Sequence, residues 1–188
     1  AKQAHKNRNW QKVILLMEDV IPIQKKELGD SHRSLIYSYE LLSWSYLKVY
    51  NYEKAIELQE KYIKIQERIL DKSSLKLAFS YSNISNPYYK LGRYDKALNY
   101  LQKAISIEEA RGKDNNKSLS NHYDHIGQVY IRAGKLNEAL VFIEKSIEIR
   151  KNVFELDHPK LGVSYNNLAS VYSELGEHEK ALEYFMRS

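Results

Sequence analysis

Apolar and small residues recur along the chain at the spacing of a helix, and the whole pattern repeats every 42 residues. Each repeat holds a tyrosine, an aliphatic residue, a small residue and a second tyrosine, separated by three, one and three positions. This spacing puts all four side chains on one face of an α-helix. We therefore expect a first helix in each repeat over these four sets: Tyr39, Leu42, Ser43 and Tyr46; Tyr81, Ile84, Ser85 and Tyr88; Tyr123, Ile126, Gly127 and Tyr130; Tyr165, Leu168, Ala169 and Tyr172.

A second helix is predicted after each first one. Three sets of residues spaced 42 apart, which we call columns, mark this helix. One column is alanine, where a larger side chain would hold two close-packed helices apart, and two columns are isoleucine. They comprise Ala55, Ala97, Ala139 and Ala181; Ile21, Ile63, Ile105 and Ile147; Ile23, Ile65, Ile107 and Ile149. Because the isoleucine columns begin before the first complete repeat, residues from about Trp10 to Leu28 are expected to form the second helix of an earlier repeat.

These columns divide the chain into one series of repeats, with no separate domain. We expect the end of a preceding repeat over residues 1–30, repeats over 31–72, 73–114 and 115–156, and a truncated repeat over 157–188. Since the last residues fall inside a helical pattern, the sequence predicts a fragment of a longer protein.

The ends of the helices have their own signals. Residues with a side-chain oxygen that can cap a helix stand 42 apart, and we expect N-caps at Ser31, Ser73, Asn115 and Asp157. Pro159 then takes an early helical position. Turns are expected at Gly92, Gly134 and Gly176, because glycine readily takes the positive φ that can end a helix, with Tyr50 as the exception.

Two prolines lie inside predicted helices. Pro87 stands where the sister repeats have Val129 and Val171, and Pro22 lies inside the first predicted helix. Each removes a backbone hydrogen bond, so we expect each to kink or break its helix.

A fixed period of about 20 to 50 residues is typical of stacked units that cannot bury their apolar faces alone. The chain resembles the tetratricopeptide repeat family. The Tyr-Asn-Asn-Leu-Ala-x-Val-Tyr stretch at Tyr165 to Tyr172 and the Asp-His-Pro at Asp157 resemble the longer kinesin-light-chain type of repeat. This resemblance implies an all-α, right-handed superhelix of antiparallel helix pairs, a solenoid whose first helices line a concave groove.

Composition excludes several kinds of partner. The 188 residues carry 29 Lys and Arg against 24 Asp and Glu, and the two signs alternate along the chain, so we expect no nucleic-acid binding. No apolar run approaches the roughly 18 residues of a membrane span, so no membrane partner is expected. Absence of cysteine suits a reducing compartment and favours a cytoplasmic location.

No constellation of catalytic residues stands out. His122 and His125 lie three apart, a spacing that can present two metal ligands to one side, but the sequence places no third ligand beside them. We expect surface histidines there, and solvated charges at Glu108 and Glu109. No Ser-His-Asp order, phosphate-binding glycine loop or Cys-His pair is present. The sequence therefore predicts a protein that is not an enzyme and holds no metal or cofactor.

The groove implied by the resemblance is the candidate binding site. Its N-terminal half is aromatic and aliphatic, and its C-terminal half is rich in amides, which can both donate to and accept from a peptide backbone. Lys48, Lys90 and Arg132 stand 42 apart and would form a cationic ladder, or else are solvated helix-end cations favoured by the helix dipole. The predicted peptide-binding residues are Tyr37, Trp44, Lys48, Phe79, Asn83, Asn86, Tyr89, Lys90, Asp124, His125, Gln128, Arg132, Asn166 and Asn167.

Two functions remain open. The first is a non-catalytic scaffold that binds a peptide segment or partner protein in the groove, or another part of its own full-length chain. The second is the sensory or regulatory arm of a larger bacterial kinase, protease or peptide-responsive transcription regulator. End-to-end self-association is a further expectation, because helix faces near Trp10 to Val20 and Ala181 to Met186 lack a neighbour.

Overall fold

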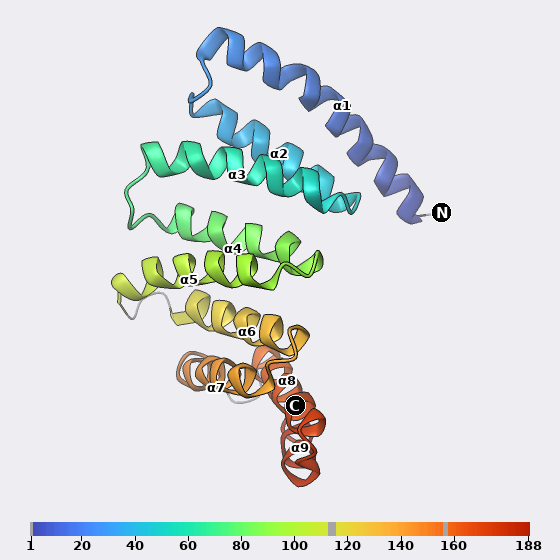
Figure 1. Ribbon diagram of the computed structural model, residues 1–188, viewed down its shortest axis with the longest axis vertical. Helices are drawn as coiled ribbons and strands as arrows, with labels where there is room; N and C mark the ends of the chain where they lie inside the picture. The colour runs from blue at the N-terminus through green and yellow to red at the C-terminus, as the bar shows by residue number, and fades with distance from the viewer. Residues whose placement is uncertain (1, 113–115, 156–157) are drawn as a thin grey trace. The chain divides into compact units, whose positions relative to one another are not determined.

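The computed structural model describes residues 2–112, 116–155 and 158–188, and most of these residues lie in helices (Figure 1). The predicted caps Asn115 and Asp157 lie outside the described residues. The helices are α1 (Lys2–Leu28), α2 (Ser34–Lys48), α3 (Tyr52–Ile69), α4 (Leu75–Lys90), α5 (Tyr94–Ala110), α6 (Asn116–Arg132), α7 (Leu136–Val153), α8 (Pro159–Glu174) and α9 (His178–Phe185). The described part of the chain holds no strand, which confirms the all-α prediction. It also holds no helix both long and apolar enough to cross a membrane.

The chain forms two compact units, an N-terminal unit up to Arg93 and a C-terminal unit from Tyr94. The N-terminal unit contains α1 to α4, and the C-terminal unit contains α5 to α9. Inside each unit every helix packs mainly on the helices before and after it in sequence, as Figure 1 shows for α2, α3 and α4. Such nearest-neighbour packing is how repeat proteins build a core from units that cannot bury their apolar faces alone.

Buried columns form that core. The four repeated alanines are buried, and so is the isoleucine column that begins at Ile21. The second isoleucine column is not uniform, because Ile65 is buried whereas Ile23 is exposed. At Gly127 the approach between α6 and α7 is close enough that an added Cβ would lie 2.6 Å from Cγ1 of Ile143.

The repeated tyrosines tie successive helices together by hydrogen bonds. In the N-terminal unit the hydroxyls of Tyr81 and Tyr88 on α4 donate to the carboxylates of Glu67 and Glu60 on α3, at 2.7 and 2.6 Å. Tyr123 of the C-terminal unit donates to Glu109 at 2.5 Å. Each ring therefore fills core space while its hydroxyl reaches a polar partner at the edge.

The predicted turns are confirmed. Gly92, Gly134 and Gly176 have φ of 70, 72 and 80°, and Tyr50 takes the same conformation at 62°. After each of them the next backbone N–H donates to the carbonyl of the second tyrosine in the repeated set, as from Asn51 to Tyr46 at 2.9 Å. This hydrogen bond belongs to the Schellman motif, in which a residue of positive φ closes a helix.

The caps predicted at Ser31 and Ser73 are wrong. The residue before α2 is Arg33, and the residue before α4 is Ser74. Ser31 instead accepts from the guanidinium of Arg68 at 2.9 Å, and the N–H of Ser73 donates to Asp71 at 2.7 Å. Both serines thus form hydrogen bonds in the loop that precedes the helix, and neither caps the helix.

The start of α8 is capped by a side chain. Its cap is His158, whose Nδ1 accepts from the backbone N–H of Lys160 at 3.2 Å, and Pro159 is the first helical residue.

Neither internal proline breaks its helix, so the predicted break is wrong at both positions, and the predicted kink stays a prediction. Helix α1 runs through Pro22, and α4 runs through Pro87. Pro87 is almost completely buried, so its ring contributes packing that offsets the hydrogen bond it removes.

Candidate functional site

The first helices of the N-terminal unit present aromatic rings to solvent. Tyr37 and Trp44 of α2 are 63% and 50% exposed, and Phe79 of α4 is 61% exposed. Tyr37 and Phe79 occupy the same position in successive repeats, so the two rings mark one face of the unit. Large rings left in water are more informative than scattered exposed aliphatic residues, because they supply rigid contact area to a partner.

A hollow of about 400 Å³ opens between these two rings. Helix α2 forms one wall, the start of α4 forms the other, and the last turn of α3 with Leu70 closes the base. The lining residues, which define the Gln66 hollow, are Arg33, Ile36, Tyr37, Glu40, Gln66, Ile69, Leu70, Leu75, Lys76, Phe79 and Ser80. The site prediction named only Tyr37 and Phe79 of this set. Gln66 and Ile69 were missed because they come from a second helix, outside the face that the resemblance pointed to.

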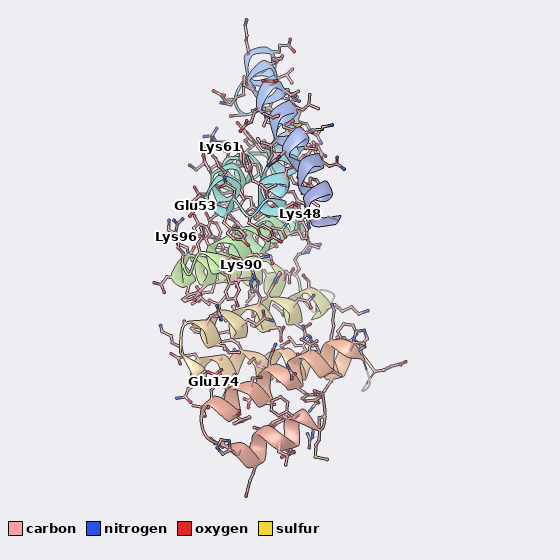
Figure 2. All side chains as sticks on the ribbon, turned by 90° about the vertical axis from the view of Figure 1, so that its right-hand side faces the viewer. Lys48, Glu53, Lys61, Lys90, Lys96 and Glu174 are labelled. Atoms are coloured by element: carbon pink, nitrogen blue, oxygen red, sulfur yellow. The ribbon has the colours of Figure 1, made fainter. Side chains whose placement is uncertain are left out.

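Two cations of the predicted ladder lie at the ends of first helices. Lys48 closes α2 and Lys90 closes α4, and both side chains are exposed. The Nζ of Lys48 lies 4.2 Å from the ring centre of Trp44, and that of Lys90 lies 5.5 Å from the ring of Tyr89. Figure 2 shows Lys48 to the right of Glu53 and Lys61, which come from α3. Each lysine thus lies over an aromatic ring of its own helix, a contact that holds the charge beside an apolar surface.

The remaining residues predicted in this unit are amides of α4. Asn86 is exposed and Asn83 is half-buried.

In the C-terminal unit, Asp124 belongs to a buried cluster. Its carboxylate is 6% exposed and lies 3.4 Å from Nη1 of Arg150 on α7. The same guanidinium donates to the backbone oxygen of Lys160 at 2.9 Å and to the hydroxyl of Ser164. Burial lowers the pKa of Arg150, and the charge of Asp124 opposes that shift. Asp124 therefore ties α6, α7 and α8 together, and a ligand would reach it only by displacing part of this cluster.

The other predicted residues of this unit differ in exposure. Gln128 is half-buried and donates to Asp124 at 3.1 Å, and His125 is half-buried too. Arg132, in the last turn of α6, is exposed. Asn166 is exposed, whereas the side-chain nitrogen of Asn167 is buried and has no hydrogen-bond partner among the described residues.

Two expectations about charged residues are wrong. His122 is buried rather than on the surface, and its Nε2 lies 3.2 Å from a carboxylate oxygen of Glu108, which is itself 4% exposed. Glu108 also accepts from the hydroxyl of Ser118 at 2.6 Å. These contacts replace the water that either group would lose on burial, and they join α5 to α6. No group of three His, Cys, Asp or Glu side chains among the described residues could hold a metal ion.

Repeated helical hairpins with alanine contacts and glycine turns define an all-α repeat protein of the solenoid class. Residues 51–110 and 118–188 match the family model described as tetratricopeptide repeat. The chain belongs to the tetratricopeptide repeat family. Repeats of this family are interaction scaffolds, and the families built from them are generally non-catalytic.

Solved structures agree with this class. The chain is 23% identical to a putative kinesin light chain of Podospora anserina with nearly identical TPR-like repeats, with a TM-score of 0.82 over 98% of this chain and 89% of that one. BtubC (BKLC) from P. vanneervenii gives 23% identity and a TM-score of 0.82 over 97% and 73%. The apo form of RapI is 17% identical, with a TM-score of 0.78 over 98% of this chain and 52% of that one. These likenesses show that the fold is a tetratricopeptide repeat fold of the kinesin-light-chain-like type. No curated protein matches the sequence.

Proposed function

We propose that this chain is a non-catalytic scaffold that binds a peptide segment, or a partner protein, on the face of its first helices. The observation that carries the proposal is the exposure of Tyr37 and Phe79, one repeat apart, on the helices that end in Lys48 and Lys90. Rings and cations that repeat along one face suit an extended chain, because an extended peptide also presents its side chains at regular intervals.

The ligand chemistry follows from these side chains. Exposed rings favour aromatic or large apolar residues, and the lysines that lie over Trp44 and Tyr89 favour carboxylates nearby. The amides Asn83, Asn86, Asn166 and Asn167 would pair with the backbone of the bound segment. Asp124, His125, Gln128 and Arg132 belong to the proposed surface as well, with Asp124 available only if its cluster with Arg150 opens.

The ligand is a segment of a separate protein or another part of the full-length chain. A regulatory arm of a larger bacterial kinase, protease or transcription regulator is the second proposal, and the likeness to RapI supports it through fold only. A cytoplasmic location and end-to-end self-association remain predictions.

Selection from a random peptide library tests the proposal. The chain and a variant with Lys48→Glu, Lys90→Glu and Arg132→Glu would be used as separate baits. We expect the parent to enrich peptides that combine acidic with aromatic or large apolar residues, and the variant to lose them, because it places three carboxylates where three cations stood.

A matched control separates local contacts from net charge. Lys12→Glu, Lys64→Glu and Lys151→Glu make the same change of charge at exposed positions of α1, α3 and α7. This control should enrich the same peptides as the parent. If the control loses them too, or if the parent enriches no such peptides while both variants are folded, the first-helix face is not the binding site.

A further inference from the structure

A polar residue occupies the same position near the end of successive second helices, half-buried in the first of them and buried in the next three. The residues are Gln24, Gln66, Glu108 and Arg150, spaced 42 apart. Three of them bond to the first helix that follows, fourteen residues further on. Gln24 accepts from Ser38 at 2.6 Å, Glu108 pairs with His122 at 3.2 Å, and Arg150 donates to Ser164.

Gln66 is the exception in this column. Its side chain is 7% exposed, and its Oε1 is buried with no hydrogen-bond partner within the part of the chain that the structure describes. The equivalent hydroxyl, on Ser80, donates instead to the backbone oxygen of Lys76 at 3.0 Å. A buried acceptor without a donor has lost its water and gained no partner, so the position is unfavourable as it stands.

The Gln66 hollow opens at the place where this hydrogen bond is missing. Gln66 lines it together with Ser80, between the rings of Tyr37 and Phe79. The last torsion of a glutamine side chain is broad, so a rotation of the carboxamide can turn its acceptor toward the hollow. A ligand with one uncharged N–H donor would then supply the partner that Ser80 does not.

The charges at the hollow further define the ligand. Arg33 and Lys76 line it, both are exposed, and neither forms an ion pair among the described residues. Glu40 is the single acid among the lining residues. Two unpaired cations against one acid favour an anionic group on the ligand over a cationic one.

We propose that the Gln66 hollow binds a small aromatic acid, a flat ring that donates a ring N–H to Oε1 of Gln66 while its carboxylate faces Arg33 and Lys76. A volume of about 400 Å³ suits one such molecule, since small-molecule sites combine apolar walls with a few placed polar groups. Tyr37 and Phe79 also belong to the proposed peptide-binding face, so this ligand and a bound peptide would share these two rings.

Indole-3-acetate is the probe, with binding followed by the shifts of backbone amide signals in nuclear magnetic resonance. 1-Methylindole-3-acetate keeps the ring and the carboxylate but lacks the N–H. We expect the methylated probe to bind about ten-fold more weakly, the penalty for leaving one buried acceptor unpaired. In Gln66→Leu the two probes should bind equally, because the acceptor is gone. Equal binding of the two probes to the parent chain would overturn the proposal.

Gln24→Leu is the matched control, since it removes the carboxamide of the same column where Ser38 already pairs with it. It should lower the melting temperature and keep the difference between the probes. Gln66→Leu should leave the melting temperature equal or higher, because it removes an unpaired polar group. A loss of stability in Gln66→Leu as large as in Gln24→Leu would show that Oε1 of Gln66 has a partner, and the proposal would fail.

N-Acetyltryptophanamide distinguishes a free acid from a peptide side chain, because it carries the same ring and N–H without a carboxylate. Weaker binding than indole-3-acetate supports the role given to Arg33 and Lys76. If N-acetyltryptophanamide binds as tightly as indole-3-acetate or tighter, the assignment to a small acid is wrong. The occupant would then be an aromatic side chain of a partner protein.

Discussion

Tyr50 occupies a backbone conformation that the other repeats give to glycine. Its φ of 62° lies in the left-handed region, which costs an L-residue roughly 1 to 2 kcal/mol. The turn nevertheless has the same hydrogen bonds as those at Gly92, Gly134 and Gly176. The Tyr50 ring meets Tyr52 edge-on at 6.4 Å between ring centres, which returns part of that cost.

We expect Tyr50→Gly to raise the free energy of unfolding by roughly 0.5 to 1 kcal/mol. Glycine relieves the left-handed strain but loses the ring contact and more backbone entropy. The measurement is the midpoint of thermal unfolding, which should rise by a few degrees. Gly134→Ala is the control and should move the midpoint downward. A lower midpoint for Tyr50→Gly would mean that the ring contact outweighs the strain.

Single residues were the hardest level to predict from the sequence. Helix-face columns correctly predicted the alanines and the glycine turns, because steric constraints at those positions admit few residue types. They failed at Ser31, Ser73 and His122, whose roles depend on a partner distant in sequence or on loop geometry. The peptide-binding residues remain predictions. Asp124 shows why they are hard to choose, because its burial beside Arg150 on another helix cannot be read from the sequence.

At the scale of elements, helix α4 contains a proline where its sisters contain valine. Pro87 removes the backbone hydrogen bond that would reach the carbonyl of Asn83, one turn earlier, yet α4 continues to Lys90. Valine is buried at the equivalent positions Val129 and Val171, so the space accepts an aliphatic side chain.

We expect Pro87→Val to raise the melting temperature by several degrees, since about 1 kcal/mol corresponds to 2 to 4 °C in a chain of this size. The restored hydrogen bond should exceed the entropy that valine adds to the unfolded chain. Differential scanning calorimetry measures the change, and Val171→Pro is the reverse control, which should lower it. An unchanged or lower temperature for Pro87→Val would show that α4 is not strained.

The order and type of the helices followed from the 42-residue period, because an amphipathic pattern repeated four times leaves few alternatives. The Gln66 hollow did not follow. Its lining residues come mainly from three helices, and the unpaired acceptor of Gln66 depends on the Ser80 hydroxyl bonding within its own helix, which leaves no trace in a sequence.

For the whole molecule, alkaline pH should reveal how the tyrosine contacts contribute to stability. Burial, together with hydrogen bonds to Glu18 and Glu109, raises the pKa of Tyr46 and of Tyr123 to about 12, whereas an unfolded tyrosine titrates near 10. Between about pH 10 and 12 the unfolded chain has lost these protons and the folded chain still holds them. The free energy of unfolding should therefore fall as pH rises through this range.

Urea unfolding at a series of pH values from 9 to 12 measures this slope. Each group contributes at most about 1.4 kcal/mol per pH unit. Tyr46→Phe and Tyr123→Phe should each make the slope shallower, one through each unit of the chain. Slopes identical to that of the parent would show that other groups control the alkaline transition.

The column of Gln24, Gln66, Glu108 and Arg150 also bears on how many repeats the gene can carry. Recombination between similar repeats removes or adds whole periods, and a 42-residue deletion keeps every helix in register. Loss of residues 73–114 would bring His122 to the place of Ser80 beside Gln66, so the imidazole that now contacts the carboxylate of Glu108 would face an amide instead. A shortened array would thus place different side chains against each other at the new junction, because each junction between repeats has its own polar residues.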